Sequence, residues 1–446
     1  MTPAPVFKIL PSTQKYDWGK KGLSSKVAQF AAASKIPGFE LDQSTPYAEL
    51  WMGTHPSGPS RVLDTNELLS EHLAKNPDLM GTQVLNKFDN AKHGNIPFLF
   101  KVLAIEKALS IQTHPDKETA KILHKEKPDI YKDDNHKPEM ALAISPFTAL
   151  CGFLPLPKLA TYISSVPEFS ALIPSAISSA FLSQVSSSPD PASPDVKASL
   201  RDVFSAVMTA SESLFKSELT KLVKRYANGE VKEDEGDVKD LVLQLESQFP
   251  GDIGVFCAFM LNYVKLQPGE AIFLAAGEPH AYVSGDIMEC MATSDNVIRA
   301  GLTPKLRDIP NLVAGLTYTS AAPSKHLIKP APFVRAETFA TTVELYDPPV
   351  PEFSVLQIKV PPTSGKSETD KPEEGVVAEA AKVETLAPIS GPSIAIVTSG
   401  GGRVAWAKQA GGLELGTGDV VFVGAGTEVE VLGGGEGMVV YWAFVE

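Results

Sequence analysis

The sequence predicts a mainly β protein with an all-α insertion, in which two β-barrel or sandwich units accompany one helical domain. Strand-like apolar runs dominate both ends of the chain, whereas the block between them lacks strand patterning and spaces its apolar residues helically. Because the helical block interrupts the first β region, we expect a discontinuous β domain of residues 1–153 and 251–325. A helical domain of 154–250 and a C-terminal β domain of 326–446 complete the prediction.

Length and composition suit a soluble protein of several domains. The 446 residues leave room for about three domains of roughly 150 residues each. Hydrophobic residues make up 43% and charged residues 21%, and the net charge is 40 − 53 = −13. Such an acidic chain disfavours nonspecific binding to nucleic acid or anionic membranes. An anionic substrate would therefore need a local basic pocket.

Cysteine content and apolar patterning indicate a cytoplasmic protein. Cys151, Cys257 and Cys290 cannot all pair, and two of them lie in apolar surroundings, so we expect reduced core residues. The N-terminus lacks the layout of a signal peptide. The longest uncharged stretches, 141–157 and 170–189, are interrupted by Pro, Gly or Ser and predict no membrane span.

The first β region begins with a strand at Val6–Leu10, followed by Trp18 as a core residue or a pocket wall. Residues 47–62 predict a strand and a tight loop. Residues 97–105 predict a buried strand with one charge, Lys101, in its middle. That ammonium group must be paired or face a wet cavity, or else lie at an edge with its amine reaching water.

The helical block contains one long amphipathic pattern. Apolar residues recur at helical spacing from Leu200 to Leu222, and the pattern predicts a helix that begins near Pro194 and ends near Asn228. Residues 238–249 predict a second helix and 253–263 a last apolar one. Beyond Pro332 we expect strands at 333–345, 353–360, 393–398, 403–407, 420–423, 428–432 and 438–445, with a mobile loop at 363–374.

The stretch from Ser110 to Glu139 carries the first candidate ligands. Gln112 and His114 are two residues apart, so a strand places both side chains on one face together with Ser110. Lys137 and Glu139 share a face in the same way. Each residue taken singly is more often structural, but together Gln112, His114 and Glu139 are three potential ligands of a metal.

His280 supplies a fourth candidate. It follows a turn at Pro268-Gly269, a short apolar strand at 271–275 and a bend at Gly277–Pro279, and Tyr282 shares its face. This layout is typical of the metal-binding half of a cupin, or jelly-roll, barrel.

The same unit occurs twice in the chain. Residues 415–431 align with 266–282, matching Gly418 to Gly269 and Gly426 to Gly277, while Val429 takes the position of His280. The repeat therefore predicts two cupin-like units, of which the second carries no metal at this position.

The segment after His280 mixes apolar and charged residues. Glu289 lies among Met and Cys, and burial there would raise its carboxyl pKa. Arg299 and Lys305 are cations close to Gly301 and Pro304, suited either to a phosphate or to a surface salt bridge.

Four stretches resemble type I mannose-6-phosphate isomerase, also called phosphomannose isomerase. They are Gln-Thr-His-Pro-Asp-Lys (112–117), Asn-His-Lys-Pro-Glu-Met (135–140), Gly-Glu-Pro-His-Ala-Tyr (277–282) and residues 294–305. The resemblance spans nearly the whole chain and is weakest at 363–382. It implies one zinc ion held by Gln112, His114, Glu139 and His280, with Arg299 as a catalytic residue. It also implies interconversion of mannose 6-phosphate and fructose 6-phosphate, which supplies GDP-mannose for glycosylation.

The chemistry of the residues agrees with that implication. An aldose–ketose isomerase moves a proton between adjacent carbons through an enediolate, and three neutral ligands plus one carboxylate leave an electrophilic zinc site. The substrate-binding candidates are Trp18, Lys101, Ser110, Lys137, Tyr282 and Lys305. We expect Glu289 to be the base, ahead of Tyr282, Lys137 or a zinc-bound water. The only expected partner is a phosphosugar, and we expect a monomer.

Two other functions stay open at this point. An Fe(II) dioxygenase would normally use more His ligands or a face of two His and one carboxylate, and a Gln ligand fits zinc better. A non-catalytic, sugar-binding double cupin would not need Lys101, Lys137, Glu289 and Arg299 together around a metal.

Overall fold

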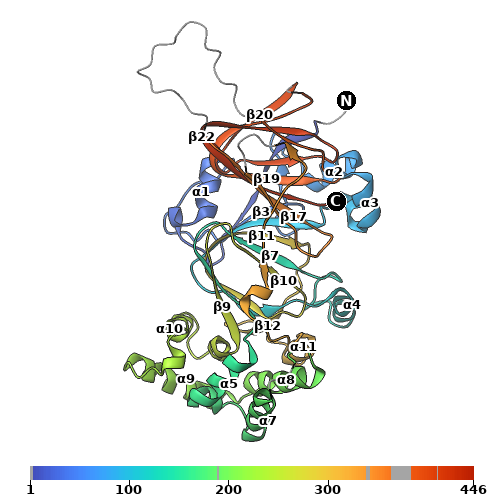
Figure 1. Ribbon diagram of the computed structural model, residues 1–446. Coiled ribbons are helices and arrows are strands. Elements are labelled where there is room, and N and C mark those ends of the chain that lie inside the picture. Colours follow the sequence, from blue (N-terminus) through green and yellow to red (C-terminus); the bar gives the residue numbers. More distant parts are fainter. Residues whose placement is uncertain (1–3, 188–189, 338–341, 363–382, 409) are drawn as a thin grey trace.

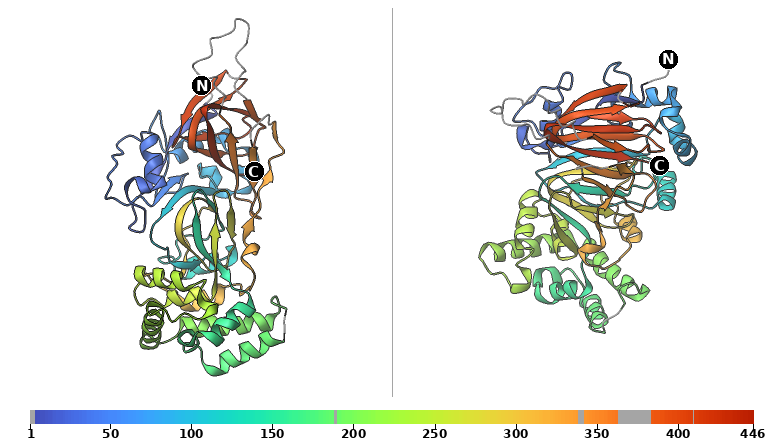
Figure 2. Two further views of the ribbon diagram at one scale, coloured as in Figure 1. Left: turned by 60° about the vertical axis from the view of Figure 1, so that its left-hand side comes forward. Right: turned by 45° about the horizontal axis from the view of Figure 1, so that its top comes forward.

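A computed structural model describes residues 4–187, 190–337, 342–362, 383–408 and 410–446. Two antiparallel sheets and a helical insertion make up the fold, as predicted (Figure 1). The helical insertion lies at one end of the molecule and the C-terminal sheet at the other, with the sheet that carries the predicted ligands between them (Figure 2).

The first sheet contains the predicted ligands. Its main path runs β13-β10-β7-β11-β5-β3-β2. Off this path, β6 and β8 pair with β11, β12 pairs with β6, and β9 pairs with β8. Its strands are β2 (Ser12–Gln14), β3 (Glu49–Met52), β5 (Phe98–Ile105), β6 (Ile111–Thr113), β7 (Glu139–Ala143), β8 (Phe147–Phe153), β9 (Leu261–Leu266), β10 (Ala271–Leu274), β11 (His280–Ala292), β12 (Ile298–Gly301) and β13 (Leu327–Ile328).

The second sheet is mainly C-terminal. Its main path runs β14-β16-β17-β22-β19-β21-β1-β4, with β15, β18 and β20 attached. The strands are β1 (Val6–Leu10), β4 (Arg61–Val62), β14 (Ala331–Pro332), β15 (Ala336–Glu337), β16 (Thr342–Tyr346), β17 (Ser354–Val360), β18 (Val383–Leu386), β19 (Ser393–Trp406), β20 (Gly411–Gly416), β21 (Val420–Val423) and β22 (Val429–Phe444).

Helices flank the sheets and form the insertion. The flanking α-helices are α1 (Lys26–Ala33), α2 (Leu69–Lys75), α3 (Thr82–Lys87), α4 (Lys117–Glu126) and α11 (Ile309–Gly315). The insertion contains α5 (Leu156–Ser165), α6 (Pro167–Ser170), α7 (Ser175–Ser186), α8 (Pro194–Met208), α9 (Glu212–Ala227) and α10 (Lys239–Gln248), followed by the 3-10 helix η5 (Ile253–Phe259). Among the helices in the described ranges, none combines the length and apolar character that a membrane span requires.

The central strands of the first sheet are buried on both faces. Phe98, Phe100 and Met140 point toward the second sheet and share a core with its Ile394 and Phe422. The alternate residues of the same strands, such as Leu103 and Ala141, point into the first β unit, the one built on the first sheet. This double burial explains why these strands read as nearly continuous apolar runs.

The repeat predicted from the sequence is present in the structure. Gly269 and Gly418 both have positive φ, +93° and +87°, and so do Gly277 and Gly426 at +74° and +72°. In both copies the first turn closes with a reciprocal pair of hydrogen bonds. The Glu270 amide donates to the Gln267 carbonyl oxygen and the Gln267 amide to the Glu270 carboxylate. The Asp419 amide donates to the Gly416 carbonyl oxygen and the Gly416 amide to the Asp419 carboxylate in the same way. Val429 begins β22 as His280 begins β11.

Two helical predictions were wrong in detail. The long helix predicted from Pro194 to Asn228 is two helices, α8 and α9, because Ser211, at the N-cap position of α9, adopts an extended backbone conformation. α8 then packs against α7, whereas α9 packs against α6 and α10. Residues 253–263 form η5 and then the start of β9, because Leu261–Leu266 pairs with β8.

Several predicted C-terminal strands are longer or differently divided. The predicted strands 393–398 and 403–407 fall in one strand, β19, whose pairing register with β22 shifts on both sides of Gly400. Residues 428–432 and 438–445 likewise form one strand, β22. Part of the predicted strand 333–345 and the predicted mobile loop 363–374 lie outside the described residues.

The N-terminal segment contributes to both sheets. β1 pairs with β21 of the second sheet, and β2 pairs with β3 of the first. The division into domains at 153, 250 and 325 stays a prediction. The two β units are joined by the chain segment that runs from β1 to β2 and by the shared core.

We expect Gly418→Ala to destabilise the protein more than Gly269→Ala. Both glycines have left-handed backbones that cost an alanine about 1–2 kcal/mol. At Gly418 an added Cβ would also lie 2.1 Å from the Phe30 carbonyl oxygen, whereas at Gly269 its nearest neighbour is 3.9 Å away. Urea unfolding of both variants tests this, and equal losses would contradict it.

Candidate metal centre and substrate cleft

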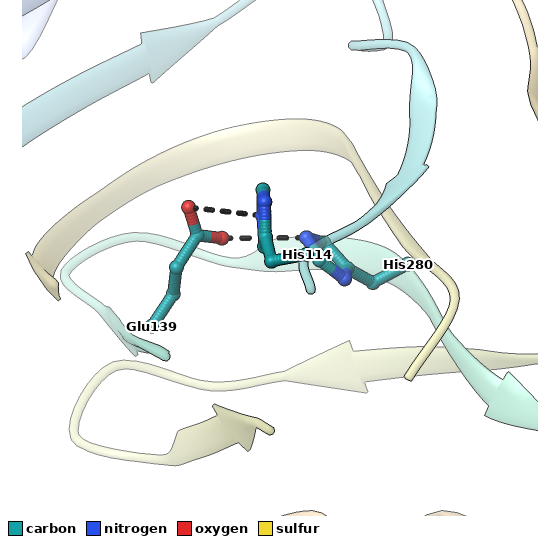
Figure 3. A group of neighbouring side chains, drawn as sticks. All are labelled: His114, Glu139 and His280. Carbon is teal, nitrogen blue, oxygen red and sulfur yellow. Dashed lines mark ion pairs between the residues drawn. The ribbon is translucent and has the colours of Figure 1, made fainter. Parts of the chain in front are cut away.

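Three buried side chains converge inside the first β unit (Figure 3). His114 follows β6, Glu139 begins β7 and His280 begins β11. Each carboxylate oxygen of Glu139 lies 3.3 Å from one Nε2 atom, Oε1 from His114 and Oε2 from His280. All three residues are only 1% exposed.

The hydrogen bonds of the two imidazoles determine which ring nitrogens carry protons. His114 Nδ1 donates to the Asn296 carbonyl oxygen at 2.7 Å, and His280 Nδ1 donates to the Glu278 carbonyl oxygen at 3.0 Å. Because carbonyl oxygens only accept, each neutral ring presents a lone pair on Nε2 toward Glu139. Within the described residues, neither Nε2 atom nor Glu139 Oε2 has a hydrogen-bond partner. A cation between them would satisfy all three atoms.

Electrostatics favour ligand-competent protonation states. Burial lowers the pKa of His114 to about 4, against the opposing charge of Glu139, so the ring is neutral at pH 7. Burial opposes ionisation of Glu139, but Lys137 and then His114 outweigh it and hold its pKa well below the usual range. Two imidazole nitrogens and one carboxylate suit zinc, and they also suit Fe(II).

Gln112 lies next to these donors. It pairs with His280 in the contact between β6 and β11 and with Arg299 between β6 and β12. The Ser110 hydroxyl lies 3.5 Å from its Oε1 atom. Its place as a fourth ligand stays a proposal.

A cleft of about 540 Å³ opens beside Gln112. It brings together five of the predicted site residues, which are Trp18, Ser110, Gln112, Arg299 and Lys305. Trp18 stacks on Tyr16 at its rim, with ring centroids 6.0 Å apart, so Trp18 is a pocket wall. Glu49, Lys107 and Phe249 also line this space.

Arg299 faces the cleft without a counterion. Burial alone lowers its pKa, and in the described part of the chain no carboxylate lies within ion-pair distance of its guanidinium. An unpaired guanidinium that is partly removed from water favours an anionic ligand. The sequence left open that Arg299 and Lys305 pair with surface carboxylates, but among the described residues neither cation has a carboxylate within ion-pair distance.

Lys101 belongs to a buried charge network. Its ammonium lies 3.1 Å from Glu289 Oε2, 3.4 Å from Glu49 Oε2 and 4.9 Å from the centre of the Trp51 ring. Trp51 Nε1 donates to Glu49 at 2.5 Å. Of the two settings considered for Lys101, the paired one is correct, because β5 lies between β3 and β11 and has no free edge.

Burial acts on the pKa of Glu289 and on that of Lys101 in opposite directions, because it disfavours the charged form of each. It raises the pKa of Glu289, as predicted, against the lowering effect of Lys101. It also disfavours the charged form of Lys101, but Glu289 and Glu49 outweigh that effect and raise the Lys101 pKa. A carboxyl group of raised pKa in an enclosed site is a candidate for general acid–base chemistry.

Tyr282 and Lys137 lie beside the three donors. The Tyr282 ring is 6.3 Å from the His280 ring, and Lys137 Nζ lies 3.0 Å from Glu139 Oε1. Neither residue lines the cleft, nor do Lys101 and Glu289. The site therefore has an interior of buried charges and an open cationic side.

Comparison with known proteins places the chain in a family. Residues 6–156 match the catalytic domain of phosphomannose isomerase type I, and residues 172–261 match its helical insertion domain. The chain is 48% identical to mannose-6-phosphate isomerase of Cryptococcus neoformans over 96% of both chains, and 43% identical to that of Saccharomyces cerevisiae over 99% of both. The chain belongs to the type I phosphomannose isomerase family.

Solved structures agree with this assignment. A mutant of phosphomannose isomerase from Salmonella typhimurium is 27% identical, with a TM-score of 0.77, over 99% of this chain and 100% of that one. A zinc-bound mannose 6-phosphate isomerase has the same identity and coverage and a TM-score of 0.76. The cupin-like, insertion-containing fold expected of the family is confirmed.

Residues that orient the ligands were missed by sequence reasoning. The Asn296 side chain donates to Asp133, whose carboxylate also accepts from Ser294 and the Asp295 amide, so the loop before Glu139 is joined to the loop that orients His114. The partners Glu49 and Trp51 of Lys101 were also missed. An apolar strand with one buried lysine requires a counterion, and Glu49 on another apolar strand was the available signal.

We expect Lys101→Met to destabilise the protein by about 3–5 kcal/mol at neutral pH, because it leaves two buried carboxylates unpaired. Removal of the ammonium raises the Glu289 pKa further above its unfolded value, which favours the protonated folded state. The loss should therefore shrink as pH falls toward the unfolded carboxyl pKa near 4–5 and grow toward pH 8.

Urea unfolding at pH 5 and pH 8 measures this loss. Lys359→Met is the control, since it removes a partly exposed pair with Glu344 and should cost less than about 0.5 kcal/mol at either pH. A Lys101→Met loss that is small or independent of pH would contradict the account.

Proposed function

We propose that this chain is a zinc-dependent isomerase that interconverts D-mannose 6-phosphate and D-fructose 6-phosphate. The observation that carries the proposal is the convergence of the buried Nε2 atoms of His114 and His280 with the Glu139 carboxylate, beside a cleft lined by Arg299 and Lys305, in a chain of this family. A cytoplasmic enzyme of this kind would supply mannose 6-phosphate for GDP-mannose synthesis and protein glycosylation. We propose further that it acts as a monomer.

Four residues would hold the zinc ion: Gln112, His114, Glu139 and His280. The orphaned lone pairs and the fixed Nδ1 protons fit such a group, and the amide of Gln112 adds a neutral oxygen. When bound, zinc would act as a Lewis acid toward a sugar oxygen. Zinc rather than iron is supported by the zinc-bound relative and by a reaction that needs no redox step.

The cations of the cleft would bind the anionic parts of the substrate. Arg299 has no carboxylate partner among the described residues and lies opposite Gln112 in the pairing of β12 with β6. It would therefore stabilise the negative charge that develops on the sugar oxygens. Lys305 and Ser110 would contact the phosphate or hydroxyl groups, and Trp18 would form an apolar wall against the sugar.

Glu289 is our candidate for the base that moves the proton between C1 and C2. Its raised pKa brings proton exchange closer to neutral pH, and Lys101 holds its carboxylate in place at 3.1 Å. Lys137 would fix Glu139 in its ligand orientation, and Tyr282 would exclude water next to His280.

We expect chelation to abolish isomerase activity and added zinc to restore it. A coupled assay of mannose 6-phosphate conversion, with metal content measured in parallel, tests the reaction and the metal together. His280→Ala should lose both zinc and activity because it removes one ligand.

His124→Ala is the matched control, since its Nδ1 also contacts a backbone carbonyl, at 2.7 Å, but it lies on α4 outside the cluster. It should keep zinc and activity. Protein shown to hold zinc but unable to convert the sugar would sink the proposed function, and iron as the bound metal would overturn the zinc assignment.

We expect Glu289→Gln to lower kcat by about 10²–10⁴ while zinc stays bound, because the amide cannot accept the proton. The substitution nearly preserves the shape of the side chain. Near-normal turnover in the zinc-loaded variant would assign the base to another group.

A further inference from the structure

The end of the helical insertion forms one wall of the substrate cleft. Phe249, directly after α10, lines it, and Lys107 Nζ lies 4.3 Å above the centre of its ring. The Gln248 side chain accepts a hydrogen bond from the Ala108 amide at 2.9 Å, two residues before Ser110. The insertion therefore contacts the site directly.

Asp252 connects this wall to the loop that follows β12. Its Oδ1 accepts from the Leu302 amide at 2.8 Å and its Oδ2 from the Thr303 amide at 3.1 Å. Oδ1 also accepts from the Gly254 amide at 2.7 Å, so one carboxylate joins both segments. Leu302 has a φ of +53°, a left-handed conformation that a non-glycine residue keeps only when its surroundings hold it there.

Backbone packing reinforces this connection. A Cβ added to Gly301 would lie 2.5 Å from the Gly254 Cα atom, so the two glycines permit direct contact between η5 and β12. On the other side of the loop, Arg307 donates to the Ala300 carbonyl at 2.6 Å and to the Met208 carbonyl of α8 at 3.3 Å. The loop 302–308 is thus held at both ends, and the insertion contributes to each.

The loop presents Lys305 to the cleft. Lys305 lines the same space as Arg299 and Lys107, and in the described residues none of these three cations has a carboxylate within ion-pair distance. Asp17 and Glu49 also line the cleft, so it is not uniformly positive. Of the three unpaired cations, Lys305 lies two residues after Thr303, whose amide Asp252 accepts from.

We propose that Asp252 is a positioning residue for the phosphate group of the substrate. It holds the 302–305 backbone in the conformation that places the Lys305 ammonium in the cleft, and so makes the helical insertion part of the substrate site. This inference rests on the proposed function in that its ligand is a sugar phosphate.

Binding of mannitol 6-phosphate to the zinc-loaded protein tests the inference by calorimetry. This alditol has no carbonyl carbon and cannot be isomerised, so binding is measured without turnover. We expect Asp252→Ala and Lys305→Ala each to weaken binding by about tenfold, as for loss of one charge-assisted contact. The double variant should also lose only about tenfold, because both changes remove the same interaction.

Asp252→Asn refines the result. Its single amide oxygen can still accept from Leu302, but its NH₂ group cannot accept from Thr303, so we expect an intermediate loss. In the coupled assay, Asp252→Ala should raise KM with kcat changed less than about twofold, because positioning of the phosphate acts on ground state and transition state alike.

Two controls separate positioning from general damage. Glu168→Gln weakens the buried pair of Glu168 with Arg225 inside the insertion, away from the cleft, and should leave mannitol 6-phosphate affinity unchanged. Zinc content should be unchanged in every variant. Unphosphorylated mannitol should bind wild type and Asp252→Ala equally weakly.

Wild-type affinity in Asp252→Ala, or a hundredfold loss in the double variant, would overturn the inference. A wild-type protein that binds mannitol 6-phosphate but does not convert mannose 6-phosphate would contradict the proposed function. The binding affinities of the Asp252 variants would then still test the positioning role of Asp252. A wild-type protein that does not bind mannitol 6-phosphate would overturn the inference itself.

Discussion

Buried charge on one face of the first sheet is the constraint on which the site depends. Glu139 and Glu289 are almost fully enclosed, and an enclosed carboxylate must find a compensating partner. Lys137, two residues before Glu139 in the chain, is the partner of Glu139. Lys101, opposite Glu289 in the pairing of β5 with β11, is the partner of Glu289. The strand order β7-β11-β5-β3 is what brings these groups within contact.

The opposite face of the same strands explains the second β unit. Phe100 and Met140 pack there against residues of the C-terminal sheet, including Phe422. A sheet covered on both sides holds its side chains in few conformations, which suits a site that needs fixed geometry. The second copy of the repeated unit keeps the turn and its glycines but begins its strand with Val429, where the first copy begins with His280.

The helical insertion completes the side that the sheets leave open. α10 ends at the cleft, and the segment after it bonds to the loop beyond β12. A polar interior with one open, cationic side suits a small anionic substrate, because buried groups set the chemistry while the cleft admits and orients the ligand.

Local patterns in the sequence were enough to predict the repeated unit, a helical insertion and the candidate donors His114, Glu139 and His280, which the structure brings together. In the short motifs that contain His114, Glu139 and His280, the alternation of a strand sets the face toward which each side chain points. The burial of Glu289 followed from its apolar neighbours. Only the tertiary structure decided that Glu49 and Glu289 enclose Lys101, that β1 crosses to the second sheet, that the long helix breaks at Ser211 and that Asp252 reaches Leu302. These features depend on contacts between residues distant in sequence, and periodicity carries no record of such contacts.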